Sequence, residues 1–204
     1  MSGYIQVNLK DLSETMGEAY CQSIVSDFSC PLNKDVEEFL QQKAWLFAQQ
    51  GLAATHLVFA SYQEKPVLAG YFTLANKHFH IDSHKGDISN TLRRRISKFA
   101  QYDADLKKYI VSAPLIGQLG KNYAHGYQSL LTGDELLELA CRKVREIQQN
   151  IGGRIVYLEC EDKLPLLDFY GRNGFCDFGK RLLEADEVET LSGKYLIQLL
   201  RYLK

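Results

Sequence analysis

The sequence predicts a mixed α/β domain, and three observations carry this prediction. Apolar residues recur with a period of two in some segments and near 3.6 in others, which indicates strands interleaved with helices. Two strand-like runs, 54–61 and 67–76, are joined by the turn sequence YQEKP, which predicts an antiparallel hairpin. The chain has 204 residues, enough for one self-supporting core, and no linker interrupts it. One domain over residues 1–204 is therefore expected.

Polar caps and glycines mark the helix boundaries. Asn33 is expected to cap a long helix whose apolar residues recur at helical spacing until Gly51 ends it. The stretch 78–101 is polar and irregular, with one short helix inside it. The expected strands are 4–9, 54–61, 67–76, 109–119, 154–160, 175–183 and 195–203, and the expected helices are 13–28, 33–50, 91–99, 133–149 and 163–172.

Composition argues against several classes of protein. The formal net charge is −1, so the chain has no global basic field for nucleic acid. No run of about eighteen apolar residues occurs, and the N-terminus lacks a basic segment followed by an apolar one, so neither a membrane span nor a signal peptide is expected. The five cysteines form no C-x-x-C pair, which favours reduced thiols in a cytoplasmic protein.

Three histidines raise the question of a metal site. His78 and His80 are two residues apart, and His84 follows closely. A metal site needs further ligands, and no cysteine or acidic spacing nearby completes a set. Solvent-facing histidines explain the pattern better, so no metal is expected.

The first informative segment leads into the helix expected at 133–149. Thr132 and Glu135 form a T-x-x-E capping box, which specifies where this helix begins. A loop entering a helix N-terminus presents backbone N–H groups and the positive end of the helix dipole, and a pyrophosphate suits such a place. The same pattern also fits a plain strand–loop–helix crossover without a ligand.

A second segment, 152–175, predicts a strand followed by a short helix. Asp162 is a candidate N-cap, and Pro165 fits the first helical turn, where its missing N–H is not needed. Asn173 and Gly174 suit the left-handed end of a helix. Tyr170 lies on the last turns, where it is either a half-buried packing residue or an acid facing a crevice between strands.

Together these segments resemble the Gcn5-related N-acetyltransferase (GNAT) family. That family places a Q/R-x-x-G-x-G/A pyrophosphate loop after a strand and a Tyr-x-x-x-Gly-Phe-like signature on a later helix. Here Gln128 and Gly133 match the loop, whereas Leu131 stands where its first glycine is usual, and the loop is longer than usual. The resemblance implies a GNAT-like acyl-CoA N-acyltransferase fold, with a mostly antiparallel sheet, splayed strands and flanking helices.

The N-terminal half resembles a subset of the family, the GNAT toxins of bacterial toxin–antitoxin pairs. The similar stretches are FSCPLN at 28–33, the helix after it, and GYFTLAN at 70–76, although Pro31 replaces the usual glycine. Some of these toxins acetylate aminoacyl-tRNA, which implies tRNA and an antitoxin as partners. The run Arg93-Arg94-Arg95 is either an RNA-contacting patch or a solvated helix face.

The resemblance also implies a mechanism of direct acetyl transfer from acetyl-CoA to an amine. The pantetheine arm would pass between the strands that end at 119–121 and 159–161. Tyr170 would protonate the leaving thiolate, and Glu159 or Glu161 would accept the proton of the amine. Cys160, mid-strand without a paired histidine, is expected to be a buried structural thiol. Acetyl-CoA is expected to contact Leu119, Gly120, Lys121, Gln128, Ser129, Leu130, Leu131, Thr132, Gly133, Asp134, Asp162 and Phe169.

Three functions remain open from the sequence. The first is an acetyltransferase acting on a small-molecule, peptide or protein amine. The second is a toxin that acetylates aminoacyl-tRNA. The third is a CoA-binding module without turnover, which Leu131 in the loop and the acidic pair Asp134 and Glu135 motivate, because negative charge near two phosphates costs affinity unless Lys121 or another cation offsets it. The chain is expected to be a monomer or a homodimer.

Overall fold

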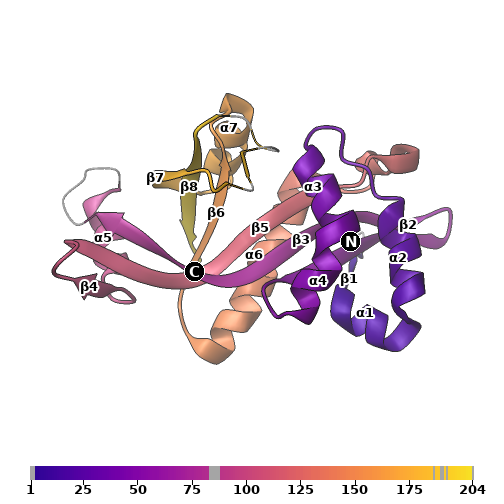
Figure 1. The fold of residues 1–204 in the computed structure, drawn as a ribbon, viewed down its shortest axis with the longest axis horizontal. Helices are drawn as coiled ribbons and strands as arrows, with labels where there is room; N and C mark the ends of the chain where they lie inside the picture. Colours follow the sequence, from indigo (N-terminus) through magenta and orange to yellow (C-terminus); the bar gives the residue numbers. More distant parts are fainter. Residues whose placement is uncertain (1–2, 83–87, 186, 189–190, 192, 204) are drawn as a thin grey trace. The chain divides into compact units, whose positions relative to one another are not determined.

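The computed structural model describes residues 3–82, 88–185, 187–188, 191 and 193–203. Strands and helices alternate along the chain as the sequence predicts (Figure 1). The strands are β1 (Ile5–Asn8), β2 (Ala54–Tyr62), β3 (Lys65–Asp82), β4 (Gln101–Asp103), β5 (Lys108–Lys121), β6 (Ile155–Glu161), β7 (Cys176–Leu182) and β8 (Tyr195–Tyr202). The helices are α1 (Leu9–Met16), α2 (Glu18–Ser26), α3 (Lys34–Glu38), the π-helix η1 (Phe39–Lys43), α4 (Ala44–Gln49), α5 (Asn90–Ile96), the 3₁₀-helix η2 (Ala124–Ser129), α6 (Gly133–Ile151) and α7 (Leu164–Arg172).

The strands hydrogen-bond in the order β1-β2-β3-β5-β6-β8-β7, and β4 pairs with β5. Five strand pairs are antiparallel: β1 with β2, β2 with β3, β4 with β5, β6 with β8, and β7 with β8. The mixed α/β class with a mostly antiparallel sheet is confirmed. The chain divides into two compact units, Met1–Ala75 with Ile116–Arg142, and Asn76–Leu115 with Lys143–Lys204.

In the first unit the N-terminal helices cover the strands that precede and follow them. Helix α1 packs against β2, α2 and α4, and its N-cap Asn8 accepts a hydrogen bond from the backbone of Lys10 (Figure 1). The core centres on Phe28 and Tyr71, whose rings meet edge to face with centroids 5.2 Å apart. Both side chains are fully buried, and the Tyr71 hydroxyl donates to the carbonyl oxygen of Val36, which ties β3 to α3.

Two predicted helices of this unit are interrupted. The helix expected at 13–28 is wrong in extent, because Gly17 has a φ of 89° and separates α1 from α2. The helix expected at 33–50 begins as predicted, with the Asn33 side chain accepting from the backbones of Asp35 and Val36. The helix then continues as the π-helix η1, which no residue pattern in this segment predicts.

In the second unit β8 lies between β6 and β7, and an aromatic cluster fills the core. The ring of Phe79 lies 4.6 Å from those of both Tyr157 and Phe178. The expectation of irregular structure from residue 78 is wrong, since β3 continues to Asp82. Phe79 and Ile81 are buried, whereas His78 and His80, which alternate with them, are exposed. Strand β4 was not predicted either, because three polar and aromatic residues carry no strand periodicity.

Among the described residues, no helix combines the length and the apolarity that a membrane span requires. The five cysteines are all free thiols, and only Cys176 is exposed.

Candidate functional site

The start of α6 is organised by the predicted capping box, which the structure confirms. The Thr132 hydroxyl accepts a hydrogen bond from the backbone N–H of Glu135 at 3.2 Å. The Glu135 carboxylate accepts from the backbone N–H of Thr132 at 2.8 Å and from its hydroxyl at 2.7 Å. These bonds, first the one from the Thr132 backbone, lower the pKa of Glu135, so its carboxylate is ionised at neutral pH. The N-terminus of α6 therefore carries a negative charge.

The predicted pyrophosphate loop, 128–133, begins at the end of the 3₁₀-helix η2 and runs to the first residue of α6. Gln128 and Ser129 are exposed, Leu130 is half-buried, and the carbonyl oxygen of Leu130 accepts from the hydroxyl of Tyr4 at 3.2 Å. Gly133 opens α6, followed by the exposed Asp134. The loop leads into the N-terminus of a 19-residue helix, a place that suits an anion.

Leu131, which departs from the family pattern, is part of the core. Its side chain is only 1% exposed. Its Cδ2 atom lies 3.1 Å from the place where a Cβ on Gly70 would be, so the isobutyl group packs directly against the backbone of β3. The departure is therefore explained by packing, because the side chain points away from solvent.

The end of β5 comes close to the helices and to β3. A Cβ on Gly120 would overlap Val36 and come within 3.2 Å of Phe28 and Tyr71, so only glycine fits there. Leu119 beside it is half-buried. The ammonium of Lys121 lies 6.0 Å from the ring centroid of Tyr123, and its charge contributes to the lowered pKa of Glu135. Lys121 thus supplies a positive charge near the acidic N-terminus of α6.

Asn122, which no motif in the sequence singles out, holds this loop in place. The residue is 2% exposed. Its side-chain oxygen accepts from the backbone N–H groups of Ser29, at 3.1 Å, and Ala124, at 3.0 Å, while its amide donates to the carbonyl of Leu68 at 2.9 Å. An asparagine directly after a strand is a common turn residue, and this was the only available signal.

Tyr170 is buried in the second unit. It is 9% exposed, and burial, followed by the nearby Cys160 thiol, raises the pKa of its hydroxyl well above the ordinary value. Among the described residues its hydroxyl has no hydrogen-bond partner. The ring packs against Phe169, with centroids 4.9 Å apart, and against Phe175 at 5.9 Å. The phenol is therefore protonated at neutral pH.

The ends of α7 match the prediction in part. Pro165 lies in the first turn, and Gly174, with a φ of 78°, follows the C-cap Asn173 in the left-handed conformation. The prediction of Asp162 as N-cap is wrong, because Lys163 occupies that position without a side-chain cap bond. Asp162 instead pairs with Lys180 at 3.3 Å. The carbonyl oxygen of Phe169 accepts a hydrogen bond from the side-chain amide of Asn173 at 2.9 Å.

The two candidate bases lie on one face of β6. Glu159 accepts from the Arg181 guanidinium at 2.7 and 2.8 Å and from the amide of Gln198 at 2.8 Å. Arg181 is 26% exposed and also binds Glu187 through two bonds of 2.8 Å. Glu161, which is buried, pairs with the ammonium of Lys163 at 2.8 Å. The carboxylate of Glu159 is therefore occupied by three hydrogen bonds.

Cys160 points to the opposite face of β6, since side chains alternate along a strand. Burial raises the pKa of its thiol to about 12, which agrees with a structural thiol and argues against a nucleophile.

Two of the three arginines on α5 contact other parts of the protein. Arg93 donates to the carbonyl oxygen of Asp82 at 3.0 Å, and the guanidinium of Arg95 lies 5.1 Å from the ring centroid of Tyr202. Arg94 is exposed. His78 and His80 form a ring pair 5.6 Å apart, His84 lies outside the described residues, and no group of three potential metal ligands occurs in the part of the chain that the structure describes.

No protein-family model matches the sequence, and no curated protein matches it either. Solved structures do match. A KacT variant with a tyrosine-to-phenylalanine substitution is 16% identical, with a TM-score of 0.61 over 96% of this chain and 93% of that one. AtaT complexed with acetyl-methionyl-tRNAfMet is 15% identical, with a TM-score of 0.61 over 96% and 94%. AtaTR bound with AcCoA is 14% identical, with a TM-score of 0.56 over 99% and 94%.

The chain has the fold of the GNAT toxins AtaT and KacT. The resemblance stated from the sequence is confirmed at the level of the fold, including its N-terminal half, since the match spans nearly the whole chain. Within this GNAT fold, 119–121 and 128–134 belong to the first unit, whereas Glu159, Glu161, Asp162, Phe169 and Tyr170 belong to the second. The roles of these residues stay predictions.

Proposed function

We propose that the chain is an acetyltransferase that moves the acetyl group of acetyl-CoA to a primary amine. The observation that carries this proposal is the GNAT fold, shared over nearly the whole chain with AtaT and KacT, and AtaTR has been solved with AcCoA. A fold alone does not fix an activity. The local features that support it are the capped N-terminus of α6 at Thr132 and the protonated phenol of Tyr170.

The diphosphate of CoA is proposed to bind at the start of α6. The residues fit an anion: a long helix begins there, exposed Gln128 and Ser129 precede it, and Lys121 supplies positive charge. The Glu135 carboxylate competes for the same place, since it already takes the backbone N–H of Thr132. The backbone of 119–121 is proposed to pair with the pantetheine amides, and Leu130, Gly133, Asp134, Asp162 and Phe169 keep the cofactor-contacting roles proposed from the resemblance. Leu131 keeps such a role only through its backbone, because its side chain is buried in the core.

In the proposed reaction the amine nitrogen attacks the thioester carbonyl, the C–S bond breaks, and the leaving thiolate takes a proton. Tyr170 is the proposed donor, because its phenol is neutral and has no protein partner among the described residues. Both carboxylates are ion-paired, Glu161 with the half-exposed ammonium of Lys163 and Glu159 with Arg181. Glu161 is preferred over Glu159 as the acceptor of the amine proton, because Arg181 and Gln198 engage both carboxylate oxygens of Glu159.

Two measurements test this proposal. Isothermal calorimetry with acetyl-CoA measures binding, and release of the CoA thiol during incubation with a panel of amines measures transfer. We expect saturable binding and acceptor-dependent thiol release. Binding without release from any acceptor would favour the CoA-binding module, and no binding at all would refute the proposal.

A second candidate is the aminoacyl-tRNA toxin, which the likeness to AtaT complexed with acetyl-methionyl-tRNAfMet favours. The exposed Arg94 on α5 is a candidate phosphate contact. Such a toxin would stop growth on induction, an antitoxin would restore it, and the amino group of charged tRNA would carry acetyl. Unaffected growth together with unmodified aminoacyl-tRNA would exclude it.

A further inference from the structure

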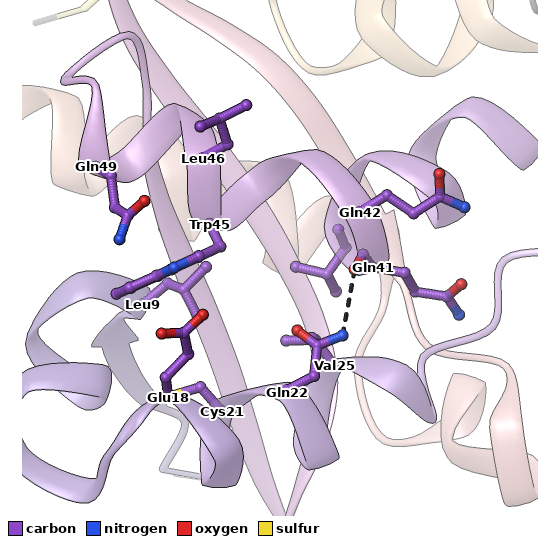
Figure 2. A pocket seen from close by; sticks show the side chains of 11 residues that line it. Leu9, Glu18, Cys21, Gln22, Val25, Gln41, Gln42, Trp45, Leu46 and Gln49 are labelled. Atoms are coloured by element: carbon purple, nitrogen blue, oxygen red, sulfur yellow. Dashed lines mark hydrogen bonds between the residues drawn. The ribbon is translucent and has the colours of Figure 1, made fainter.

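A pocket of about 280 Å³ lies among the N-terminal helices of the first unit, apart from every residue assigned a role above (Figure 2). Two helical stripes form it. Glu18, Cys21, Gln22 and Val25 recur at helical spacing on α2, and Gln42, Trp45 and Gln49 do so on η1 and α4. The stripes face each other across an open groove.

The floor of the pocket is apolar, and one carboxylate stands over it. Leu9, Cys21, Val25 and Leu40 are buried beneath the opening. Figure 2 shows the indole of Trp45 extending into the groove above Leu9 and Glu18. Glu18 is the one charged residue that lines the pocket, and no lysine, arginine or histidine of the described residues pairs with it. The groove therefore carries net negative charge.

We propose that this groove binds a lysine or arginine side chain of a partner polypeptide, with an apolar residue of the partner beside it. A cation is attracted both by the Glu18 carboxylate and by the face of the Trp45 ring. The aliphatic stem of a long basic side chain covers an apolar floor while its charged head stays near water. Leu46, 50% exposed on the same helix, offers the contact for the apolar neighbour.

The rim favours a polypeptide over other occupants. The exposed amides of Gln42 and Gln49 can both donate and accept hydrogen bonds, which suits the backbone of a bound segment. The lining holds no cation, so a nucleic acid or a phosphate would meet the Glu18 charge without compensation. The lining residues Gln22, Gln42 and Gln49 are exposed, so a bound chain can continue past the anchored side chain.

Trp45 is the single tryptophan of the chain, so its fluorescence reports occupancy of the groove directly. The probes are twelve-residue capped peptides with one arginine placed one to four residues from one leucine, each paired with a peptide carrying neutral citrulline instead. We expect saturable changes in Trp45 emission, with the best arginine peptide binding about five-fold tighter than its citrulline twin. The preference should weaken as salt rises, because Glu18 is exposed.

The Glu18→Gln variant should reduce this preference to less than two-fold, and circular dichroism confirms that it folds. Glu14→Gln, which removes the same charge from an exposed site on α1, is the matched control and should keep the preference. Equal binding of arginine and citrulline peptides, or no saturable emission change up to millimolar peptide, would overturn the proposal. Acetyl transfer is measured separately, so neither outcome depends on it.

Discussion

The side-chain oxygen of Asn122 accepts a hydrogen bond from the backbone N–H of Ser29, a residue 93 positions earlier in the chain. The backbone continues the connection, since Tyr123 donates to the carbonyl of Ser29 and Asn122 donates to the carbonyl of Ala69. The end of β5 is thus fastened both to β3 and to the loop between α2 and α3. The loop that precedes α6 begins from this fixed point.

Replacing Asn122 should therefore loosen the loop as well as destabilise the protein. Asn122→Ala leaves the Leu68 carbonyl and the Ser29 N–H without partners in a buried place, and we expect a loss of about 3 kcal/mol in unfolding free energy. Urea denaturation measures this loss. Asn150→Ala, which removes an exposed bond on α6, is the control and should cost under about 0.5 kcal/mol. Similar values for the two variants would contradict the anchoring role.

The charge at the helix mouth leads to a second prediction. Glu135→Gln removes a negative charge beside the proposed diphosphate position while a glutamine can still close the capping box. We expect CoA to bind about three-fold tighter to this variant, measured by calorimetry at low salt. The control Glu64→Gln, at the exposed tip of the β2–β3 hairpin, should leave the dissociation constant unchanged. Weaker CoA binding by Glu135→Gln would show that the carboxylate assists binding.

Local signals explain what the sequence predicted well. The Thr132–Glu135 box, the Asn33 cap and the Asn173-Gly174 helix end each depend on residues within one or two turns, so the pattern in the sequence specifies them. The β2–β3 hairpin is of the same kind, because its two strands are joined by a short turn. The GNAT-like fold followed from these motifs together.

Long-range partners explain what the sequence did not show. The bonds of the Asn122 side chain to Ser29 and Leu68, and the bonds from Arg181 to Glu159, join residues brought together only by folding. The burial of Leu131 was equally invisible, because its partner Gly70 lies on another strand. In the sequence Leu131 is only a departure from the loop pattern, whereas in the structure it is a core residue.

The proposed acid is tested by Tyr170→Phe. Removing the hydroxyl should lower the rate of thiol release about a hundred-fold while the affinity for acetyl-CoA stays within two-fold, because the ring and its contacts with Phe169 and Phe175 remain. The matched control is Tyr157→Phe, another buried tyrosine of the second unit. An unchanged rate in Tyr170→Phe would remove the residue from the mechanism.

The two candidate bases can be separated because they are two residues apart on β6. Glu161→Gln should lower the rate of thiol release at least ten-fold at neutral pH. Glu159→Gln should instead act on stability, with a loss of about 1–2 kcal/mol, because it takes a charge from the partly buried guanidinium of Arg181. Initial rates and urea midpoints are compared for both variants. The assignment fails if Glu159→Gln abolishes turnover at unchanged stability.

Alkaline pH should destabilise the protein through its buried acids. Burial raises the pKa of Tyr71, Tyr157 and Tyr170 above the ordinary value near 10, and that of Cys160 to about 12. Above pH 9 the unfolded chain releases protons that the folded chain keeps. Since the unfolded state then binds fewer protons, the free energy of unfolding falls as pH rises.

Each such group contributes about 1.4 kcal/mol of lost stability per pH unit, within the interval between its unfolded and folded pKa values. Urea midpoints between pH 8 and pH 11 measure how steeply the free energy of unfolding falls with pH. The slope should steepen near pH 10, where the tyrosines of the unfolded chain begin to ionise in addition to Cys160. Tyr170→Phe should make the slope shallower by about one group. A flat profile up to pH 11 would mean that these side chains ionise as readily in the folded protein as in the unfolded chain.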